Sequence, residues 1–531
     1  MKSLLKSFVA SAAMCGVAAS ASAANFFDWT GEAGDGLWST PGNWTISDPG
    51  NVPANGARFI ANAAEISIDQ PQTVGDIKIG HADTTESLLP TVVLLGGELT
   101  VTRNFGVGCS QYDIGYVRSY PSLAPNWRGS NAGTLVLRNS DLQVGTSEAR
   151  AGFIGVGAAI VSQGGSGVGN FTMTNGTFSA YVGDVYVGYS AQNNSLGKGR
   201  VDLQTVADGV LDISGSLFVA KAQNSTSVGE LKLGTNWTVR VGTPGAATGS
   251  LFLGTGGSWG TGSSPDGLFG MVGGSFEAYV SAISMATTAT TSPKYKGRLY
   301  LTALTNVVLS AGSVTICTSG GNWGDGSVVY GELDASTCTN VTFNAGSLTV
   351  MTTSRIYTSR DEKGILRLGR GAGTVGSVTL GNGGSGGTRQ YGLIDLKGFQ
   401  MTLTNEVKVA GCGIVSNDVN GVSSGFALNE TATLAQSDGK MYVTFSRDPE
   451  GLFKPVSPAR AEDCYWGFKW AGDHVTDVQA LVDAGKLVVD TTGLSAKFLA
   501  KYALYYSAKD DTTYLGVPVV PVGSGMKVLF R

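Results

Sequence analysis

The stretch GRVDL at residues 199–203 recurs in altered form along the chain, for example as GELKL at 229–233 and GRLYL at 297–301. In each copy a glycine precedes two apolar residues that are separated by one other residue. This alternation is typical of a β-strand with one buried face. Nine glycines, 28 to 38 residues apart, begin the pattern: Gly133, Gly169, Gly199, Gly229, Gly267, Gly297, Gly331, Gly364 and Gly392. A period of this length indicates a repeat protein built from stacked units.

Each unit contains two further alternating apolar pairs, such as Leu211/Ile213 and Leu217/Val219 after Gly199. Three short strands separated by turns predict one coil of a solenoid, with the coil-start glycines at corners where a positive φ is needed. Because a single coil cannot bury its inward face, neighbouring coils are expected to stack about 4.8 Å apart. The sequence therefore predicts an all-β fold, a parallel β-helix of about 9–11 coils that is right-handed by the crossover rule. A β-propeller is the alternative architecture.

The repeat pattern places the β-helix at residues 57–422 and leaves a segment at each end. The end of a solenoid exposes open strand edges, which invite pairing with another chain unless they are covered. Residues 24–56 contain Trp29, Trp38 and Trp44 among several glycines. We predict that these three tryptophans form an N-terminal cap.

The C-terminal segment, residues 423–531, has fewer glycines and more charged and aromatic residues than the repeats. A capping box at 476–479 and a glycine stop at Gly485 predict a helix there. Strand-like runs lie on both sides of this helix. The segment is therefore predicted to be a small α+β domain, which either caps the rod or attaches it to a partner.

The first 23 residues have the pattern of a secretory signal peptide. Lys2 and Lys6 precede a short apolar run that ends in the cleavage motif Ala21-Ser22-Ala23. The run is too short to span a bilayer, and we expect no membrane-spanning segment in the mature chain. We therefore expect a secreted protein, extracellular or on the cell surface. Five cysteines remain after cleavage and are expected to be buried small side chains: Cys109, Cys317, Cys338, Cys412 and Cys464.

A tryptophan motif precedes the repeats, with W-x-G at 29–31, G-x-W-S at 36–39 and N-W at 43–44. This opening, followed by glycine-led coils up to about residue 420, resembles secreted bacterial proteins with autotransporter-associated β-strand repeats. The chain departs from that family in having no recognisable sorting tail and no translocator barrel. The resemblance implies an exported bacterial surface protein with a scaffolding or adhesive role. It implies no catalytic residue.

The composition argues against most catalytic and metal-binding chemistry. Charged residues make up 14% of the 531 residues, the formal net charge is −4, and only two histidines are present. No basic patch points to nucleic acid. Outward acids such as Asp202 and Glu230 occur singly, unlike the paired carboxylates of glycosidases. His474 beside Asp473 is interpreted as part of a helix N-terminus rather than as a catalytic pair. We predict no catalytic, cofactor-binding or metal-binding residue.

These observations favour a non-enzymatic structural or scaffold protein of an extracellular matrix or surface layer, whose partners are itself or other surface proteins. The first alternative is an adhesin that binds glycans or cells. Aromatic residues in loops after the third strand could contact a sugar, chiefly Trp259 and Trp323, with Tyr189 and Tyr295 beside them. The less favoured alternative is a polysaccharide lyase or hydrolase, since many parallel β-helices have that activity.

Overall fold

The fold is described from a computed structural model of the chain. The described residues are 27–45, 56–59, 63–82, 91–109, 131–159, 166–193, 196–224, 226–256, 264–288, 294–319, 328–353, 361–381, 390–436 and 439–522. The signal peptide expected at 1–23 lies outside them. In the described part the chain is almost entirely β-strand, and nearly all strand pairs are parallel. The predicted parallel β-helix is confirmed.

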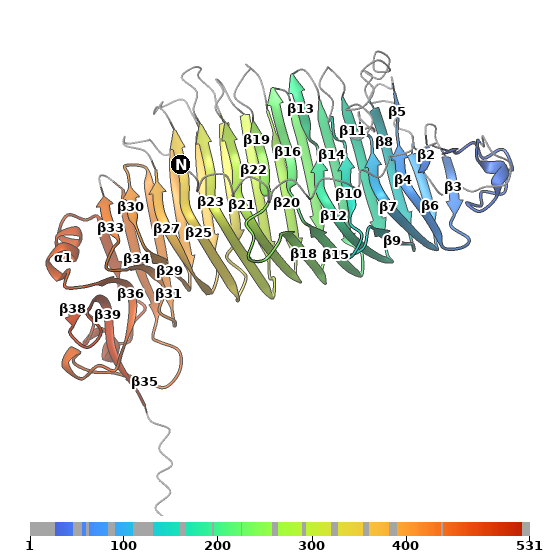
Figure 1. The fold of residues 1–531 in the computed structure, drawn as a ribbon. Coiled ribbons are helices and arrows are strands. Elements are labelled where there is room, and N and C mark those ends of the chain that lie inside the picture. The colour runs from blue at the N-terminus through green and yellow to red at the C-terminus, as the bar shows by residue number, and fades with distance from the viewer. Residues whose placement is uncertain are drawn as a thin grey trace, which may run out of the picture.

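The strands lie side by side along an elongated rod, with the N-terminal strands at one end and the C-terminal strands at the other (Figure 1). Two sheets run the length of the rod. The first, here called the repeat sheet, has 15 strands and contains the coil-start glycines. Its strands are β3 (Ala63–Ser67), β5 (His81–Ala82), β6 (Thr91–Leu95), β8 (Asn131–Arg138), β11 (Gly167–Thr174), β14 (Gly197–Thr205), β17 (Ser227–Leu233), β20 (Asp266–Val272), β22 (Lys294–Thr302), β24 (Val328–Ala335), β26 (Asp361–Leu368), β28 (Gln390–Lys397), β31 (Gly413–Asn420), β34 (Lys440–Arg447) and β37 (Leu487–Asp490).

The second sheet, here called the long sheet, has 24 strands and holds the rest of each coil. Its strands are β1 (Phe27–Asp28), β2 (Gly56–Phe59), β4 (Gln72–Ile79), β7 (Glu98–Val107), β9 (Asp141–Val144), β10 (Ala151–Val156), β12 (Thr177–Val187), β13 (Ser190–Asn193), β15 (Asp208–Ile213), β16 (Leu217–Asn224), β18 (Trp237–Gly242), β19 (Ser250–Gly256), β21 (Ser275–Thr288), β23 (Asn306–Ser319), β25 (Val341–Thr353), β27 (Gly371–Leu380), β29 (Phe399–Leu403), β30 (Glu406–Val409), β32 (Gly425–Leu428), β33 (Thr433–Gln436), β35 (Phe453–Pro455), β36 (Asp463–Ala471), β38 (Ala503–Ser507) and β39 (Thr512–Pro521).

The second and third strands of each coil were expected to be separate, but in the structure they are not always so. In several coils they form one long bent strand, and β21 and β23 each contain 14 residues. The bend falls at small residues such as Gly312 and Gly346, where an added Cβ would meet the backbone oxygen of the preceding coil at 2.8 and 2.6 Å. Because the small residues let neighbouring coils approach closely, the hydrogen-bonded ladder continues around the bend.

The nine coil-start glycines pair with one another in a single register. Gly133 pairs with Gly169, and the pairing continues strand by strand to Gly392 and then to Gly413. We call this set the glycine column. The apolar residues that follow these glycines form buried columns of their own, as in the pairing of Leu203 with Leu233. The phase of the repeat predicted from the sequence is therefore confirmed.

The expected reason for these glycines was wrong. None of the nine lies at a corner with a positive φ, because all of them lie within strands of the repeat sheet. Positive φ values belong to a second set, here called the corner column, whose members either directly follow a strand of the long sheet or lie inside one: Gly108, Gly157, Gly188, Ala220, Gly254, Ala286, Cys317, Met351 and Gly381. The glycine column packs against this corner. A Cβ at Gly199 would overlap the amide nitrogen of Gly188, so lack of space excludes a side chain there.

The parallel sheets continue past residue 422, where the sequence analysis ended the β-helix. Strand β34 pairs in parallel with β31, and β37 pairs in parallel with β34. On the other sheet β36 pairs in parallel with β32. The extra coils were not predicted because their strands, such as KMYVTFSR at 440–447, carry no leading Gly-x-apolar-x-apolar motif. Pairing with the preceding coil alone is enough to hold them in register.

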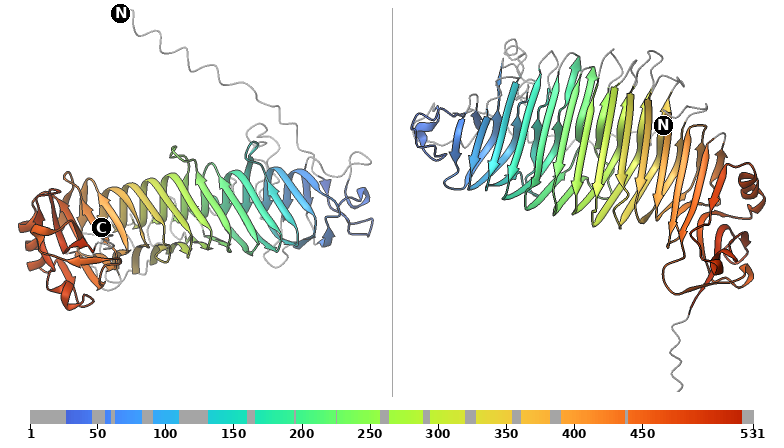
Figure 2. Two further views of the ribbon diagram at one scale, coloured as in Figure 1. Left: turned by 90° about the horizontal axis from the view of Figure 1, so that it is seen from below. Right: turned by 180° about the vertical axis from the view of Figure 1, so that it is seen from behind.

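The α+β elements of the C-terminal segment cover this end of the rod (Figure 2). Strands β38, β39 and β35 are antiparallel additions to the long sheet, reached through β36. The helices are α1 (Val475–Asp483) and α2 (Ala496–Leu499), with short 3₁₀ turns η1 (Pro41–Asn43) and η3 (Pro458–Arg460). Helix α1 ends before Gly485, whose φ is +64°, as predicted. Its N-cap is His474 rather than Thr476, which lies inside the first turn.

Among the helices of the described residues, none combines the length and the apolar character needed to cross a membrane.

Candidate functional site

The three N-terminal tryptophans pack on one another and on Phe59 of β2. The ring centroids of Trp38 and Trp44 are 5.0 Å apart, and they lie 5.8 and 5.6 Å from the Phe59 ring. Trp29 contacts Trp44 at 5.0 Å in an edge-on arrangement. Trp38 and Trp44 are buried, and Trp29 is partly buried. Their ring faces are therefore largely covered by other rings rather than offered to a sugar.

The tryptophan segment also binds the first strand of the repeat sheet. The amide of Trp38 donates to the carbonyl oxygen of Ser67 at 2.9 Å, and the amide of Ser67 donates to Gly36 at 2.9 Å. Asp35 holds the turn, because it accepts hydrogen bonds from the Thr40 hydroxyl and the Asn43 amide at 2.6 Å each. These bonds, with that from the Thr40 hydroxyl first, lower the pKa of Asp35. The segment thus covers the edge of β3.

The structure describes two of the four aromatic residues that were considered for glycan contact. Trp259 and Trp323 lie outside the described residues. Tyr295 was expected in an exposed loop, but it lies in β22 and is fully buried. Its ring packs over Gly256, where a Cβ would overlap it. Tyr189 is partly exposed and belongs to an outward-facing group of rings on the long sheet.

This group, here called the aromatic stack, consists of Phe153, Tyr186, Tyr189, Phe218 and Phe252. Tyr186, Phe218 and Phe252 occupy one register position in successive coils. Their rings are nearly parallel, with interplanar angles of 6° and centroids 5.0 and 5.3 Å apart. Since the ring faces contact one another, mainly ring edges remain for a ligand.

The ammonium group of Lys221 completes the aromatic stack. Its Nζ atom lies 3.9 Å from the Phe252 ring centroid and 4.9 Å from that of Phe218. Burial among these rings lowers the pKa of Lys221. The contact is a cation–π interaction between coils, of about 0.5–2 kcal/mol. The aromatic stack therefore stabilises the outer face of the long sheet.

The outward charges of the repeat sheet form ion pairs between neighbouring coils. Arg200 Nε lies 3.2 Å from Glu230, and Lys296 Nζ lies 3.6 Å from Asp266. Asp266 also binds Arg298 of the next strand. Glu230, which was expected to be a single acid, is thus paired with a base of the preceding coil.

The largest of these ion-pair groups surrounds Arg367 on β26. Its guanidinium binds Glu332 directly and lies 3.6 Å from Asp334 and 3.8 Å from Asp395. Glu332 is almost fully buried, and it accepts a hydrogen bond from the Tyr300 hydroxyl at 2.8 Å. Burial raises the pKa of Asp395. One arginine between three carboxylates is an arrangement that holds coils together.

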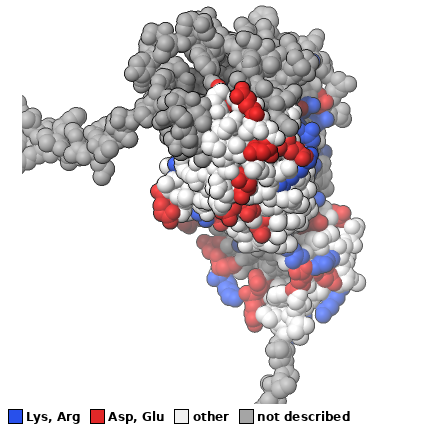
Figure 3. Space-filling view, turned by 90° about the vertical axis from the view of Figure 1, so that its right-hand side faces the viewer, with Lys and Arg blue, Asp and Glu red and all other residues white. Residues whose placement is uncertain are grey.

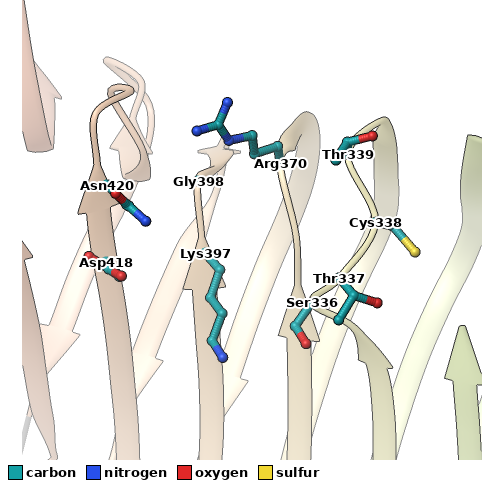
Figure 4. Close-up of a pocket in the computed structure, with 9 residues that line it drawn as sticks. All are labelled: Ser336, Thr337, Cys338, Thr339, Arg370, Lys397, Gly398, Asp418 and Asn420. Atoms are coloured by element: carbon teal, nitrogen blue, oxygen red, sulfur yellow. The ribbon is translucent and has the colours of Figure 1, made fainter. Parts of the chain in front are cut away.

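A polar pocket of about 260 Å³ lies beside this group, where four successive coils, those of β24, β26, β28 and β31, turn from the repeat sheet into the long sheet. Figure 4 shows the side chains from β31, β28 and the loop after β24 in a row across neighbouring coils. The lining residues are Ser336, Thr337, Cys338, Thr339, Arg370, Lys397, Gly398, Asp418 and Asn420.

The charged groups of the pocket differ in the hydrogen bonds and ion pairs that they form. Arg370 makes two hydrogen bonds to the Glu450 carboxylate, at 2.6 and 3.2 Å. Lys397 lies 3.9 Å from Asp395. In contrast, the Oδ1 atom of Asp418 is buried and accepts no hydrogen bond within the described part. A buried carboxylate oxygen without a donor is costly, and this atom has almost no exposed surface, so only the rest of the Asp418 side chain faces the pocket.

Sequence analysis did not find this pocket. The alternation around Val415 and Val419 does place Asp418 and Asn420 on the outward face, so the orientation of these two lining residues could be predicted. The other charged lining residues, Lys397 and Arg370, lie in preceding coils of the repeat, and Lys397 is in register with Asp418. Which outward residues meet depends on the number of residues in each coil, and that number varies.

The His474 side chain contacts Asp477 rather than forming an acid–base pair with Asp473. Its Nδ1 atom lies 2.9 Å from the Asp477 carboxylate, one turn into α1, and its ring stacks on Trp470 with centroids 3.9 Å apart. Asp473 instead accepts a long hydrogen bond of 3.4 Å from the amide of Val475. Both residues therefore shape the start of the helix.

In the described ranges, no three or more His, Cys, Asp or Glu side chains gather to hold a metal ion. The five cysteines of the described residues are buried, and none of them forms a disulfide there. Burial raises the pKa of Cys109 to about 11 and that of Cys464 to about 12. Searches against family models, curated proteins and solved structures found no match to the chain.

Proposed function

We propose that the protein is a non-enzymatic structural rod, secreted by a bacterium into an extracellular matrix or onto its surface layer. The observation that carries the proposal is the unbroken register of the glycine column from Gly133 to Gly413. Every coil in that span pairs its backbone with both neighbours and continues one apolar core. Such a rod resists bending and local opening, as a scaffold element must.

The outward charges support a structural role. Carboxylates that could serve as general acids or bases, such as Asp334 and Asp395, are shared with Arg367. These carboxylates link coils through the arginine that they share. The resemblance of the tryptophan opening and the glycine-led coils to autotransporter-associated β-strand repeats supports the proposed location outside the cell.

Contacts with other molecules are proposed to involve the sides of the rod. At the N-terminal end, residues 36–38 cover the edge strand β3. Acidic side chains are scattered over this end (Figure 3), which disfavours contact between two such ends. Strand-to-strand addition at this end is thereby discouraged, whereas the two sheets present long faces of many coils.

The proposal is tested on the chain without residues 1–23. We expect rods in negative-stain electron micrographs and concentration-dependent association in sedimentation velocity. Immunogold labelling of the native cells should place the protein in the matrix or surface layer. Release of reducing ends or unsaturated products from a panel of polysaccharides, abolished by Asp395→Asn, would overturn the proposal in favour of an enzyme.

A glycan-binding role is the second candidate, and the pocket at Asp418 favours it. The pocket is lined by carboxylate, amide, ammonium and hydroxyl side chains, which are the groups that bind sugar hydroxyls by hydrogen bonds.

A further inference from the structure

We propose that the pocket at Asp418 binds a neutral hexose unit of a polysaccharide through adjacent hydroxyl groups. The inference goes beyond the structural role, since a rod can support a matrix without binding sugar. It depends on the positions of three side chains. Asp418 and Asn420 lie two residues apart on β31 and so share its outward face, and Lys397 is in register with Asp418 on β28.

These side chains supply what a pair of neighbouring sugar hydroxyls requires. Each hydroxyl donates one hydrogen bond and accepts others. Asp418 offers an acceptor, Lys397 offers donors, and the amide of Asn420 offers both. The hydroxyls of Ser336, Thr337 and Thr339 line the opposite side of the pocket. A sugar hydroxyl would donate to the part of the Asp418 side chain that lines the pocket, since Oδ1 itself is buried.

The charge balance selects a neutral sugar over an acidic one. The guanidinium of Arg370 is neutralised by Glu450, and the ammonium of Lys397 lies near Asp395. Among the described residues that line the pocket, Asp418 is the charged residue for which no ion pair is found. A uronate or sulfate placed here would face a carboxylate of the same sign, and such pairs are unfavourable at interfaces.

The size of the pocket limits how much of a polymer it can hold. A volume of about 260 Å³ lies just below the range of about 300–1,000 Å³ for pockets that take drug-sized molecules. One sugar ring fits this space, and the rest of a chain would run across the surface. Because the lining has no aromatic ring, recognition would depend on hydrogen bonds, and each site is expected to bind weakly.

The experiment measures binding of the mature chain to soluble polymers by isothermal titration and affinity electrophoresis. The neutral probes are a β-glucan, a mannan and a galactan, and the anionic probes are an alginate and a chondroitin sulfate. We expect binding to at least one neutral polymer. Asp418→Asn, which keeps the shape but replaces an acceptor by a donor, should weaken it at least tenfold, and Asn420→Ala should weaken it less.

Asp202→Ala is the matched control, since Asp202 is an outward carboxylate of the same sheet in a distant coil. It should leave binding unchanged, and circular dichroism verifies that every variant is folded. Neutral-polymer binding that Asp418→Asn does not alter, binding of the anionic polymers alone, or binding of no polymer would each overturn the proposal. Rod formation and cell-surface labelling are separate readouts, so the structural role can stand when the sugar site fails.

Discussion

The coil that contains Gly188 and Gly199 differs from the coil that contains Met351 and Gly364, although both have the same strand pairing. In the first coil a Cβ at Gly199 would overlap the amide nitrogen of Gly188 and the carbonyl oxygen of Val156. In the second, a Cβ at Gly364 would lie 2.8 Å from the Met351 amide nitrogen and 3.0 Å from a carbonyl oxygen. The corner is narrow in the first coil and wider in the second.

The glycine column and the corner column favour glycine for two different reasons. The glycine column lacks space for a side chain in every coil, and it contains glycine throughout from Gly133 to Gly413. The corner column needs a positive φ, which costs a residue with a side chain about 1–2 kcal/mol. It therefore contains glycine in some coils and Ala220, Ala286, Cys317 or Met351 in others. A steric requirement repeats without exception, whereas a modest energetic preference does not.

The largest effect is expected from Gly199→Ala. The added methyl group overlaps backbone atoms on two strands, and these cannot move without breaking the ladder. We expect the free energy of unfolding to fall by about 4 kcal/mol or more, measured by urea titration, with hydrogen exchange accelerated most in β14. A Gly199→Ala protein with wild-type stability would remove the steric explanation for the glycine column.

The apolar columns are expected to be equally important in both regions. Leu203 and Leu368 occupy equivalent inward positions of the repeat sheet, and each is buried. Replacing either by alanine should cost about 3 kcal/mol, whereas Thr302→Ala on the exposed face should change stability by less than about 0.5 kcal/mol. Unequal losses at the two leucines would show that the width of the coil, and not the corner alone, differs between the regions.

Gly364→Ala should be milder than Gly199→Ala. The neighbouring atoms at 2.8–3.0 Å need to move by only a few tenths of an ångström to admit a methyl group. We expect a loss of about 1–2 kcal/mol, measured in the same urea titration. Equal damage from the two alanine variants would contradict the distinction between narrow and wider corners.

Stability should fall as the pH rises from about 9 to about 11. Cys109 follows the narrow corner at Gly108, and burial raises the pKa of its thiol from 9.0 to about 11. The unfolded chain loses this proton near pH 9 while the folded chain keeps it, so stability is complete below that pH and decreases above it. The loss is about 1 kcal/mol at pH 10. Melting curves at pH 8 and 10 should show a smaller decrease for Cys109→Ala, and an identical decrease would mean that the corner already admits water.

The smallest effect is expected from Ala286→Gly in the corner column. Glycine relieves the positive φ of Ala286, a gain of about 1 kcal/mol, but the buried methyl group is lost at a cost of about 0.8 kcal/mol. Stability should therefore change by less than about 0.5 kcal/mol in thermal melts. A loss above about 2 kcal/mol would show that the methyl group, rather than the φ angle, decides which residue occupies the corner.

The class of fold and the phase of the repeat could be predicted from the sequence. Alternation of apolar residues is a local property, and it determines which side chains of a strand face the core. This is why the apolar residues that follow the coil-start glycines could be expected to face the core, as the structure confirms for Leu233 and Leu301. The coils after residue 422 were missed because their strands lack the leading glycine, and sequence pattern alone does not reveal pairing with a preceding coil.

The sequence by itself determined that the protein is a repetitive, all-β chain with glycine at one position in each unit. Only the tertiary structure decided why glycine stands there, because the distance between β14 and the corner at Gly188 arises when the chain closes into a coil. The pocket also exists only in the folded rod. Lys397 and Asp418 are 21 residues apart in the chain, and they become neighbours because coils stack at the spacing of hydrogen-bonded strands, about 4.8 Å.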